Sequence, residues 1–322
     1  MKFVCIDGES QYRAIVERDV KAPLEAAGHT FDWFEESFAD VDATIARAAG
    51  YDGLYVVGDQ GPVPAGLMRA NPDLKLISFV GTGARSFVDM AEAAECGVTV
   101  TNVPDFASQS VAEHTIALMF AVARRIVEGD AIVRAGEWTK NQGLKLSGRR
   151  LGLVGAGAIG SRVGTMATAL GMDVVYWART PSASLDSATG GTAVSLEELF
   201  DTSDVVSVHL TLSEDTKGLV NRSLLERLRA SSIFINTARG DIVDTVALGE
   251  LLDRGAIFGA GLDVFAQEPV DLATLPPVSS NVALTPHIGF HTDEADDVFR
   301  LAGDNILAFA SGAPTNVLDS TD

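Results

Sequence analysis

Three ionisable side chains follow short apolar runs in the last third of this 322-residue chain. They are Arg239 in the segment INTARG, Glu268 in LDVFAQEP and His287 in TPHIG. An arginine can bind a carboxylate through two hydrogen bonds and polarise a neighbouring carbonyl group. A histidine can give a proton to a carbonyl oxygen during reduction, and a carboxylate beside it stabilises the imidazolium. Together the three side chains match the needs of reducing a 2-oxo acid.

Each of the three side chains also has an ordinary explanation when taken alone. Arg239 suits a solvated surface, Glu268 before a proline suits a turn, and His287 suits a hydrogen-bonded loop. Their joint use requires that the three apolar runs end at one edge of a parallel sheet, where the sites of α/β proteins form. The remaining sequence must therefore supply such a sheet.

The chain from Arg150 onward alternates short apolar runs with amphipathic ones, which predicts a parallel sheet covered by helices on both faces. We expect strands at 151–154, 173–177, 205–209, 232–236, 258–262 and 282–284. We expect helices near 159–170, 195–201, 221–228 and 245–254. Six strands of this kind make one doubly wound domain.

The first hundred residues repeat this alternation less regularly. Strands are expected at 2–6, 53–57 and 74–80, and helices at 44–49 and 86–95. A long helix over about 111–127 follows, with Ser108 or Ser110 as N-cap and Glu113 completing a capping box. It is too apolar for one buried stripe, so it is deeply buried or meets a second copy of the chain. A last helix at about 293–310 can belong to either domain.

A glycine-rich turn joins the strand at 151–154 to the helix after it. The sequence GAGAIG places glycines at 155, 157 and 160. Gly155 permits a tight turn, Gly157 lets the backbone approach a pyrophosphate, and Gly160 lets the helix lie close to the strand. The first N–H groups of that helix then face the phosphates of a dinucleotide. The alternative is a purely structural glycine turn. The strand before the turn and the helix after it favour dinucleotide binding.

The end of the strand at 173–177 indicates the type of dinucleotide. An acidic residue there binds the ribose hydroxyls of NAD, but this chain has Ala178, followed by Arg179 and Thr180. An arginine suits a 2′-phosphate, and the missing carboxylate removes a repulsion. We therefore expect NADP in preference to NAD. The alternative is that Arg179 is solvated and that both cofactors bind.

Charge and composition exclude several kinds of partner. The chain has 24 Lys and Arg against 44 Asp and Glu, a net charge of −20, which disfavours nucleic acid and anionic membranes. This excess of acid fits a salt-rich habitat or a solubility trait. Cys5 and Cys96 lack the spacing of metal ligands and read as buried thiols of a reducing compartment. Without an apolar run of ~20 residues or a signal peptide, the expected location is the cytoplasm.

These features together resemble the D-isomer-specific 2-hydroxyacid dehydrogenase family. That family includes glyoxylate and hydroxypyruvate reductases and, more distantly, phosphite and formate dehydrogenases. The resemblance covers about residues 74 to 290 and specifies the family far better than the substrate. It rests on GTG at 81–83, SVAEH at 110–114, the glycine turn, DVVSVHL at 204–210, INTARG, LDVFAQEP and TPHIG.

The resemblance implies an architecture, and the apolar helix over about 111–127 favours an assembly. The resemblance implies two doubly wound α/β domains, with a Rossmann dinucleotide-binding domain (101–287) inserted into a discontinuous flavodoxin-like substrate domain (1–100 and 288–322). In the family the active site lies in the cleft between the domains, whose closure excludes water. A homodimer is the expected assembly.

The resemblance also assigns roles to residues of this sequence. Arg239 would bind substrate, His287 would be the acid and base, and Glu268 would be its partner. The backbone of Val80, Gly81 and Thr82 would bind the substrate carboxylate. Thr211 stands where many members have proline, which puts that cofactor contact in doubt. The expected cofactor-binding residues are Gly155, Gly157, Ala158, Ile159, Gly160, Ala178, Arg179, Thr180, His209, Leu210, Thr211, Thr237, Ala238, Asp263, His287 and Gly289.

Some residues and functions stay open at this point. Phe290 and His291 either line and narrow the pocket or pack at a helix start, while His114 is expected as a packed core histidine. His209 is either structural or a cofactor contact. A narrowed pocket favours glyoxylate or hydroxypyruvate as substrate. The alternatives are a cofactor-sensing protein of corepressor type and an enzyme that oxidises phosphite or formate.

Overall fold

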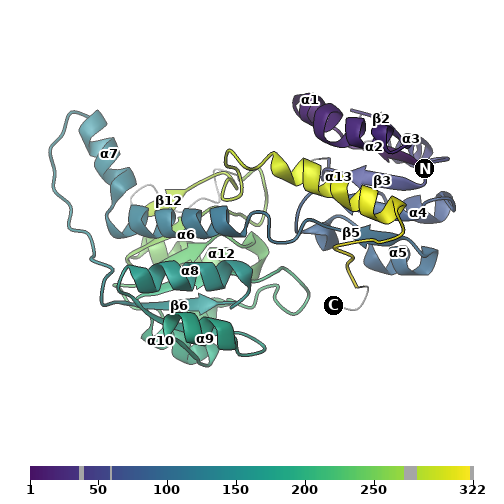
Figure 1. Ribbon diagram of the computed structural model, residues 1–322. Coiled ribbons are helices and arrows are strands. Elements are labelled where there is room, and N and C mark those ends of the chain that lie inside the picture. Colours follow the sequence, from purple (N-terminus) through teal and green to yellow (C-terminus); the bar gives the residue numbers. More distant parts are fainter. Residues whose placement is uncertain (36–39, 59, 272–280, 320–322) are drawn as a thin grey trace. The chain divides into compact units, whose positions relative to one another are not determined.

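The computed structural model describes residues 1–35, 40–58, 60–271 and 281–319 of the chain. The chain forms two compact units (Figure 1). Unit 1 comprises Met1–Phe106 and Asp293–Asp322, and unit 2 comprises Ala107–Thr292. The boundaries between the units therefore lie at 106/107 and 292/293. The prediction from the sequence had placed them at 100/101 and 287/288.

Unit 1 is built on a five-stranded parallel sheet with the strand order β2-β1-β3-β4-β5, which is the flavodoxin-like order. Two of these strands, β2 and β5, were not expected from the sequence, because both are short and their apolar residues are few. The strands are β1 (Lys2–Cys5), β2 (Thr30–Trp33), β3 (Gly53–Val56), β4 (Leu76–Phe79) and β5 (Thr99–Thr101).

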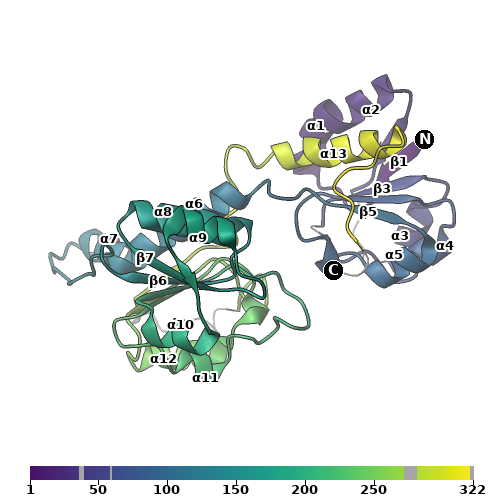
Figure 2. The same cartoon turned by 60° about the horizontal axis from the view of Figure 1, so that its bottom comes forward.

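Helices cover both faces of the unit 1 sheet (Figure 2). One face carries α1 (Arg13–Val16), a π-helical turn (Glu17–Lys21), α2 (Ala22–Ala26) and α13 (Asp297–Ala310). The other carries α3 (Val41–Arg47), α4 (Leu67–Ala70) and α5 (Met90–Cys96). The last helix, α13, therefore belongs to unit 1, in line with the resemblance, which had grouped residues 288–322 with 1–100. Short 3₁₀ turns complete the unit at Ser10–Tyr12 and Ala84–Ser86.

Unit 2 is built on a seven-stranded parallel sheet with the order β12-β11-β10-β9-β6-β7-β8. The strand order reverses at β6, with β7 on one side and β9 on the other. Such a reversal is where doubly wound sheets bind nucleotides. The strands are β6 (Arg150–Val154), β7 (Asp173–Trp177), β8 (Thr192–Ala193), β9 (Val205–Val208), β10 (Ile233–Asn236), β11 (Gly259–Leu262) and β12 (Val282–Leu284).

Two groups of helices cover the unit 2 sheet, one on each face (Figure 2). The first face packs against α6 (Ser108–Ala123), α8 (Ala158–Ala169) and α9 (Ala183–Thr189). The second packs against α10 (Leu196–Thr202), α11 (Arg222–Leu225) and α12 (Thr245–Asp253). A 3₁₀ turn at Gly240–Ile242 follows β10. The sequence had predicted α8, α10, α11, α12 and every strand of this sheet except β8 to within a few residues, but it missed α9 and β8.

The long helix expected at about 111–127 is two helices. The first, α6, ends at Ala123, and α7 (Ile126–Arg134) starts after Arg125, whose φ of 51° is left-handed and stops α-helical hydrogen bonding. The expected capping box is also absent. Ala107 is the N-cap, while Ser110 lies inside the helix and donates its hydroxyl to the carbonyl of Ala107. Figure 1 shows α7 reaching beyond the sheet of unit 2.

Two further expectations can be compared with the structure. Cys5 is buried and Cys96 is half-buried, and neither forms a disulfide. In the described part of the chain, no helix has the length and apolar character that crossing a bilayer requires.

Candidate active site

Three adjacent strands of unit 2 carry the three ionisable side chains predicted to do chemistry. Arg239 follows β10, Glu268 follows β11 and His287 follows β12, and these strands are neighbours in one parallel sheet. Because parallel strands end at the same edge, the loops after them meet there. The structure thus brings together residues that lie up to about fifty positions apart in the chain.

The imidazole of His287 pairs with the carboxylate of Glu268. Nδ1 of His287 lies 2.7 Å from Oε2 of Glu268, and Oε1 accepts the N–H of Phe265 at 2.9 Å. Partial burial alone would raise the pKa of Glu268, but the hydrogen bonds from His287 and Phe265 and the charge of Arg239 together lower it. Glu268 is therefore a carboxylate at neutral pH, and Nε2 of His287 is the ring nitrogen that points away from it.

The side chain of Arg239 is half-buried and retains hydrogen-bonding capacity. Its Nη1 donates to the carbonyl of Ala238 at 2.6 Å. Asn236 fixes the turn, since its side chain donates to the carbonyl of Arg239 at 3.0 Å and accepts the N–H of Ala238 at 3.0 Å. Burial lowers the pKa of Arg239, and the charge of Glu268 partly restores it. A guanidinium has five N–H donors and stays protonated, so it can still bind an anion.

Asp263 is a buried carboxylate at the centre of this edge, with 1% of its surface exposed. Its Oδ1 accepts the hydroxyl of Thr285 at 2.6 Å and the N–H of Ile288 at 2.9 Å, and its Oδ2 accepts the N–H of Gly289 at 2.9 Å. Desolvation raises its pKa, but the hydrogen bonds from His114, Thr285 and the two amides outweigh it and lower the pKa. Asp263 is thus ionised and holds the loop that carries His287.

The glycine-rich turn lies at the reversal of strand order, between β6 and β9. Gly155 has a φ of 112°, and a Cβ there would collide with the carbonyl of His209. A Cβ on Gly160 would collide with the carbonyl of Gly155, so α8 can begin close to the turn after β6 only if residue 160 has no side chain. Gly157 instead faces open space and caps α8 without a side-chain hydrogen bond.

This turn fits the pyrophosphate of a dinucleotide. The N–H groups of Ala158, Ile159 and Gly160, in the first turn of α8, have no partner inside the helix. The helix dipole adds partial positive charge at the same place. The open space at Gly157 lets an anion approach these donors, so the residues present suit the phosphates of a nicotinamide cofactor.

The end of β7 presents the residues expected to contact the adenosine ribose. Ala178 is half-buried, while Arg179 and Thr180 are exposed. Neither Arg179 nor Thr180 supplies the carboxylate that an acidic residue at position 178 would have provided. The exposed guanidinium of Arg179 can therefore bind a 2′-phosphate without moving away from an internal acidic partner.

The remaining cofactor candidates gather around the same edge. His209 and Leu210 contact the turn at Gly155, and Thr211 is exposed. Burial lowers the pKa of His209 to about 3, and its Nε2 lies 2.9 Å from the hydroxyl of Ser207. Thr237 is buried, with its hydroxyl 2.9 Å from that of Thr115, and Ala238 is half-buried beside Arg239.

The expected carboxylate-binding loop lies in unit 1, directly after β4. Val80 is buried and donates its N–H to the carbonyl of Val56, and Gly81 has a φ of 144°. Thr82 is exposed and accepts a hydrogen bond from the side chain of Asn102 at 2.9 Å. The role of this loop in binding substrate stays a prediction.

Two aromatic groups stand next to the catalytic candidates. The ring of Phe290 packs edge-on against the imidazole of His287, with 5.9 Å between centroids, and is 40% exposed. Phe290 also contacts His291, again edge-on at 5.9 Å. Trp138 lies in the chain after α7 and is 81% exposed.

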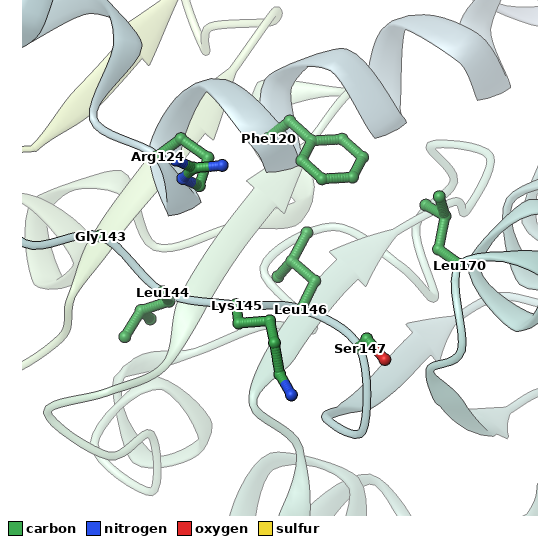
Figure 3. Close-up of a pocket in the computed structure, with 8 residues that line it drawn as sticks. All are labelled: Phe120, Arg124, Gly143, Leu144, Lys145, Leu146, Ser147 and Leu170. Carbon is green, nitrogen blue, oxygen red and sulfur yellow. The ribbon is translucent and has the colours of Figure 1, made fainter.

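A cavity of about 370 Å³ lies elsewhere in unit 2 (Figure 3). Phe120 of α6 and Arg124, the residue that follows this helix, face the segment 143–147, which leads into β6. It therefore lies at the amino end of β6, whereas the glycine turn follows the carboxyl end. None of the candidate catalytic residues lines it.

The sequence alone did not point to Asn236, Thr285 or the polar contacts of His114. Asn236 was recognisable as a residue that forms turns after a strand, since its side chain mimics backbone hydrogen bonds. The approach of His114 to Thr285 depends on the packing of α6 against the sheet, across 171 positions of the chain. No local sequence signal reports such a contact.

Comparison with known proteins gives a consistent result. Residues 116–289 match the family model described as D-isomer specific 2-hydroxyacid dehydrogenase, NAD binding domain. The chain is 39% identical to a glyoxylate reductase of Thermococcus litoralis, over 97% of this chain and 92% of that protein. It is 34% identical to a glycerate dehydrogenase of Methylorubrum extorquens, over 99% of both.

A solved structure has the same fold over the whole chain. The crystal structure of a glyoxylate reductase from Paecilomyes thermophila is similar with a TM-score of 0.88 and 27% sequence identity, covering 100% of this chain and 99% of that one. The similarity therefore extends across both units.

Proposed function

This chain belongs to the D-isomer specific 2-hydroxyacid dehydrogenase family and is an oxidoreductase that transfers hydride to or from small 2-hydroxy acids, and we propose that it acts on glyoxylate and hydroxypyruvate. The observation that carries the catalytic part is the pair of His287 and Glu268, with 2.7 Å between Nδ1 and Oε2. Arg239 lies within electrostatic range of Glu268 at the same edge. The same edge holds the glycine turn suited to a dinucleotide.

His287 is the proton donor in this proposal. Glu268 holds Nδ1, so Nε2 is the nitrogen that gives its proton to the carbonyl oxygen of the substrate. A bound nicotinamide cofactor would supply the hydride for the carbonyl carbon. The product is the 2-hydroxy acid, and the neutral imidazole regains a proton from solvent. In the opposite direction Nε2 accepts the hydroxyl proton. The carboxylate of Glu268 stabilises the imidazolium in both directions.

Arg239 binds the anionic substrate. The protein carries a net charge of −20, so an acid is repelled at long range and needs a local cation. The guanidinium of Arg239 supplies it and can bind the carboxylate and the carbonyl oxygen through separate N–H groups.

The substrate preference rests on Phe290. Its ring lies against the imidazole of His287, so a substrate beside Nε2 meets an aromatic wall. Small acids such as glyoxylate and hydroxypyruvate fit beside such a wall better than branched ones. The relatives named as glyoxylate reductase and glycerate dehydrogenase support this choice.

NADP is the preferred cofactor in this proposal. Arg179 and Thr180 are exposed after β7, and Ala178 leaves no carboxylate to repel a 2′-phosphate. The pyrophosphate then occupies the start of α8, beside Gly157 and the N–H groups of Ala158 and Ile159. His209, Leu210, Thr211, Thr237, Ala238, Asp263 and Gly289 are the further cofactor contacts in this assignment.

We assign a homodimer in the cytoplasm. Three apolar side chains of α7, Ile126, Val127 and Val133, are each more than half exposed, and no residue of α7 is buried within this chain. A second copy that covers α7 would bury them. Two cysteines without a disulfide fit a reducing compartment.

The test is the change in absorbance at 340 nm with purified protein, using NADPH and NADH separately. The acids are glyoxylate, hydroxypyruvate, pyruvate and phenylpyruvate. Oxidation of NADPH with glyoxylate and hydroxypyruvate supports the proposal, and the ratio of the rates with NADPH and NADH tests the interpretation of Ala178 and Arg179. If no acid is reduced although the cofactor binds, phosphite and formate are tested as hydride donors, and a lack of all turnover favours a cofactor sensor.

A further inference from the structure

We propose that His114 is a positioning residue of the active site, which holds the loop that carries His287 through Thr285 and Asp263. The inference rests on the proposed role of His287. It concerns a helix, α6, that contributes no side chain to the proposed chemistry. His114 was expected to be a packed core histidine, but its side chain is 18% exposed and contacts polar groups.

The imidazole of His114 meets two oxygen atoms from two different loops. Its Nε2 lies 3.0 Å from the hydroxyl oxygen of Thr285 and 3.3 Å from Oδ1 of Asp263. Asp263 comes directly after β11 and Thr285 directly after β12. One nitrogen atom of α6 therefore links the ends of two neighbouring strands.

The protons in this cluster can be assigned by counting donors. The hydroxyl of Thr285 has one proton, which it donates to Oδ1 of Asp263 at 2.6 Å. The oxygen of Thr285 can then only accept a hydrogen bond from His114. Nε2 of His114 therefore carries a proton and donates it, so the polarity runs from His114 to Thr285 to Asp263.

Asp263 passes this restraint to the main chain around His287. Its carboxylate accepts the N–H groups of Ile288 and Gly289, each at 2.9 Å, and its carbonyl accepts the N–H of His287 at 2.8 Å. His287 has a φ of 54°, in the left-handed region that is unfavourable for a residue with a side chain. The hydrogen bonds to Asp263 hold His287 in this conformation.

The packing leaves little freedom around the cluster. A Cβ on Gly289 would lie 3.0 Å from Oδ2 of Asp263 and 3.4 Å from Cδ2 of His114, so the loop already touches both side chains. The next residue of α6 is Thr115, and its hydroxyl oxygen lies 2.9 Å from the hydroxyl oxygen of Thr237, which comes two residues before Arg239. Two consecutive residues of α6 thus contact the segments that carry His287 and Arg239.

A positioning role makes a different prediction from a packing role. If His114 only fills space, an apolar side chain of similar size replaces it. If its N–H matters, a side chain that donates from the same place replaces it, and glutamine can place its amide N–H near the position of Nε2. The informative set is therefore His114→Ala, His114→Leu and His114→Gln.

The experiment measures steady-state kinetics and hydrogen exchange of the full-length protein. We expect His114→Ala and His114→Leu to lower kcat on the order of tenfold to a hundredfold, because a small displacement of a catalytic group has such effects. His114→Gln should recover most of kcat. Unchanged kcat in the leucine variant, or no recovery with glutamine, overturns the proposal.

Hydrogen exchange keeps this test separate from the proposed function. Amides of the segment 285–291 should exchange about tenfold faster in His114→Leu than in the wild type, whereas His114→Gln should match the wild type. The segment 233–236 in β10 serves as the internal control. If the wild type reduces no 2-oxo acid, the proposed function fails but the exchange result still decides the role of His114.

A second pair of variants covers the case in which the alanine and leucine variants do not fold. Thr285→Val removes the hydroxyl that His114 contacts, and Thr285→Ser keeps it. Thr285→Val should show the same fast exchange at 285–291 and the same loss of kcat, and Thr285→Ser should not. Equal behaviour of the two variants contradicts the proposal.

Discussion

One carboxylate oxygen of Glu268 accepts a hydrogen bond from Nδ1 of His287 over 2.7 Å, while the other accepts a hydrogen bond from the N–H of Phe265 over 2.9 Å. Both oxygens are thus used, and the carboxylate cannot rotate without losing one bond. The pair defines which nitrogen of His287 meets a substrate. This relationship is the basis of the first prediction.

Replacement of His287 by alanine should lower turnover by a factor of ~10² to 10⁴, because a general acid contributes about that much. Cofactor binding should change little, since the glycine turn lies after a different strand. Stopped-flow or steady-state rates with NADPH and glyoxylate measure the first effect, and fluorescence titration with NADPH measures the second. Turnover near that of the wild type would remove His287 from the mechanism.

Replacement of Arg239 by alanine should chiefly impair use of the 2-oxo acid. Hydrogen bonds to a charged group contribute about 1.5–3 kcal/mol, so kcat/KM should fall roughly tenfold to more than a hundredfold. Arg239→Lys should recover only part of it, because a lysine cannot bind a carboxylate through two parallel hydrogen bonds. Kinetics for glyoxylate at saturating NADPH test this, and full activity of the lysine variant argues against two-point binding.

Cofactor preference should respond to the two residues that follow β7. Ala178→Asp adds a carboxylate where a 2′-phosphate is expected, so the ratio of kcat/KM for NADPH to that for NADH should fall on the order of tenfold to a hundredfold. Arg179→Ala should lower the same ratio by removing a cation. Ratios measured with one acid substrate decide the matter. Unaltered ratios in both variants would show that cofactor choice lies elsewhere.

Two glycines that both lie in helices should behave oppositely when changed to alanine. Gly160→Ala pushes a methyl group into the carbonyl of Gly155 and should destabilise the protein by about 1–3 kcal/mol. Gly249→Ala in α12 meets open space and should stabilise it by up to about 1 kcal/mol. Urea unfolding of the two variants measures both changes. Equal effects would mean that the close approach of α8 to the turn does not matter.

The pH dependence of stability should carry a contribution from His209. Burial lowers the pKa of His209 in the folded protein to about 3, against about 6.5 in an unfolded chain. The unfolded state therefore binds the extra proton first, and stability falls as the pH falls from about 6.5 toward 3. Above pH 6.5 this effect vanishes.

A matched pair of variants isolates that contribution. Between pH 7.5 and 5.0 the wild type should lose up to about 2 kcal/mol more stability than His209→Gln. His291→Gln is the control, because His291 is exposed. Urea unfolding at both pH values gives the comparison. A wild type and a His209→Gln variant with the same pH dependence would show that His209 is solvated.

Much of the fold followed from apolar periodicity, and the errors have physical reasons. The central strands of unit 2, such as β9 and β10, are buried on both faces, so they appear in the sequence as continuous apolar runs. Ser110 looked like a helix cap because it forms a Ser-x-x-Glu pattern with Glu113. That pattern does not show whether the backbone at Ser110 adopts the conformation that capping requires. The break at Arg125 was missed because neither glycine nor proline marks it. The short edge strand β2 lacks a run long enough to recognise.

The candidate site divides in the same way. Arg239, Glu268 and His287 could be predicted because each follows a strand within a recognisable segment, and parallel strands share an edge. The cluster of His114, Asp263 and Thr285 could not, because it depends on where α6 packs, and helix packing is set by the whole core. The residues proposed to do chemistry carried a local signal, whereas the residues proposed to restrain the loops did not.

The discontinuity of unit 1 has a consequence for how the protein is made on the ribosome. The hydroxyls of Tyr55 and Ser78 donate to the carbonyls of Phe299 and Ala302 in α13, and Leu318 adds its N–H to the carbonyl of Val100. Synthesis of the intervening unit 2 takes roughly ten to forty seconds at ordinary translation rates. During that time α13 has not yet been synthesised, so it does not cover its face of the unit 1 sheet. The nascent chain therefore completes unit 2 before unit 1.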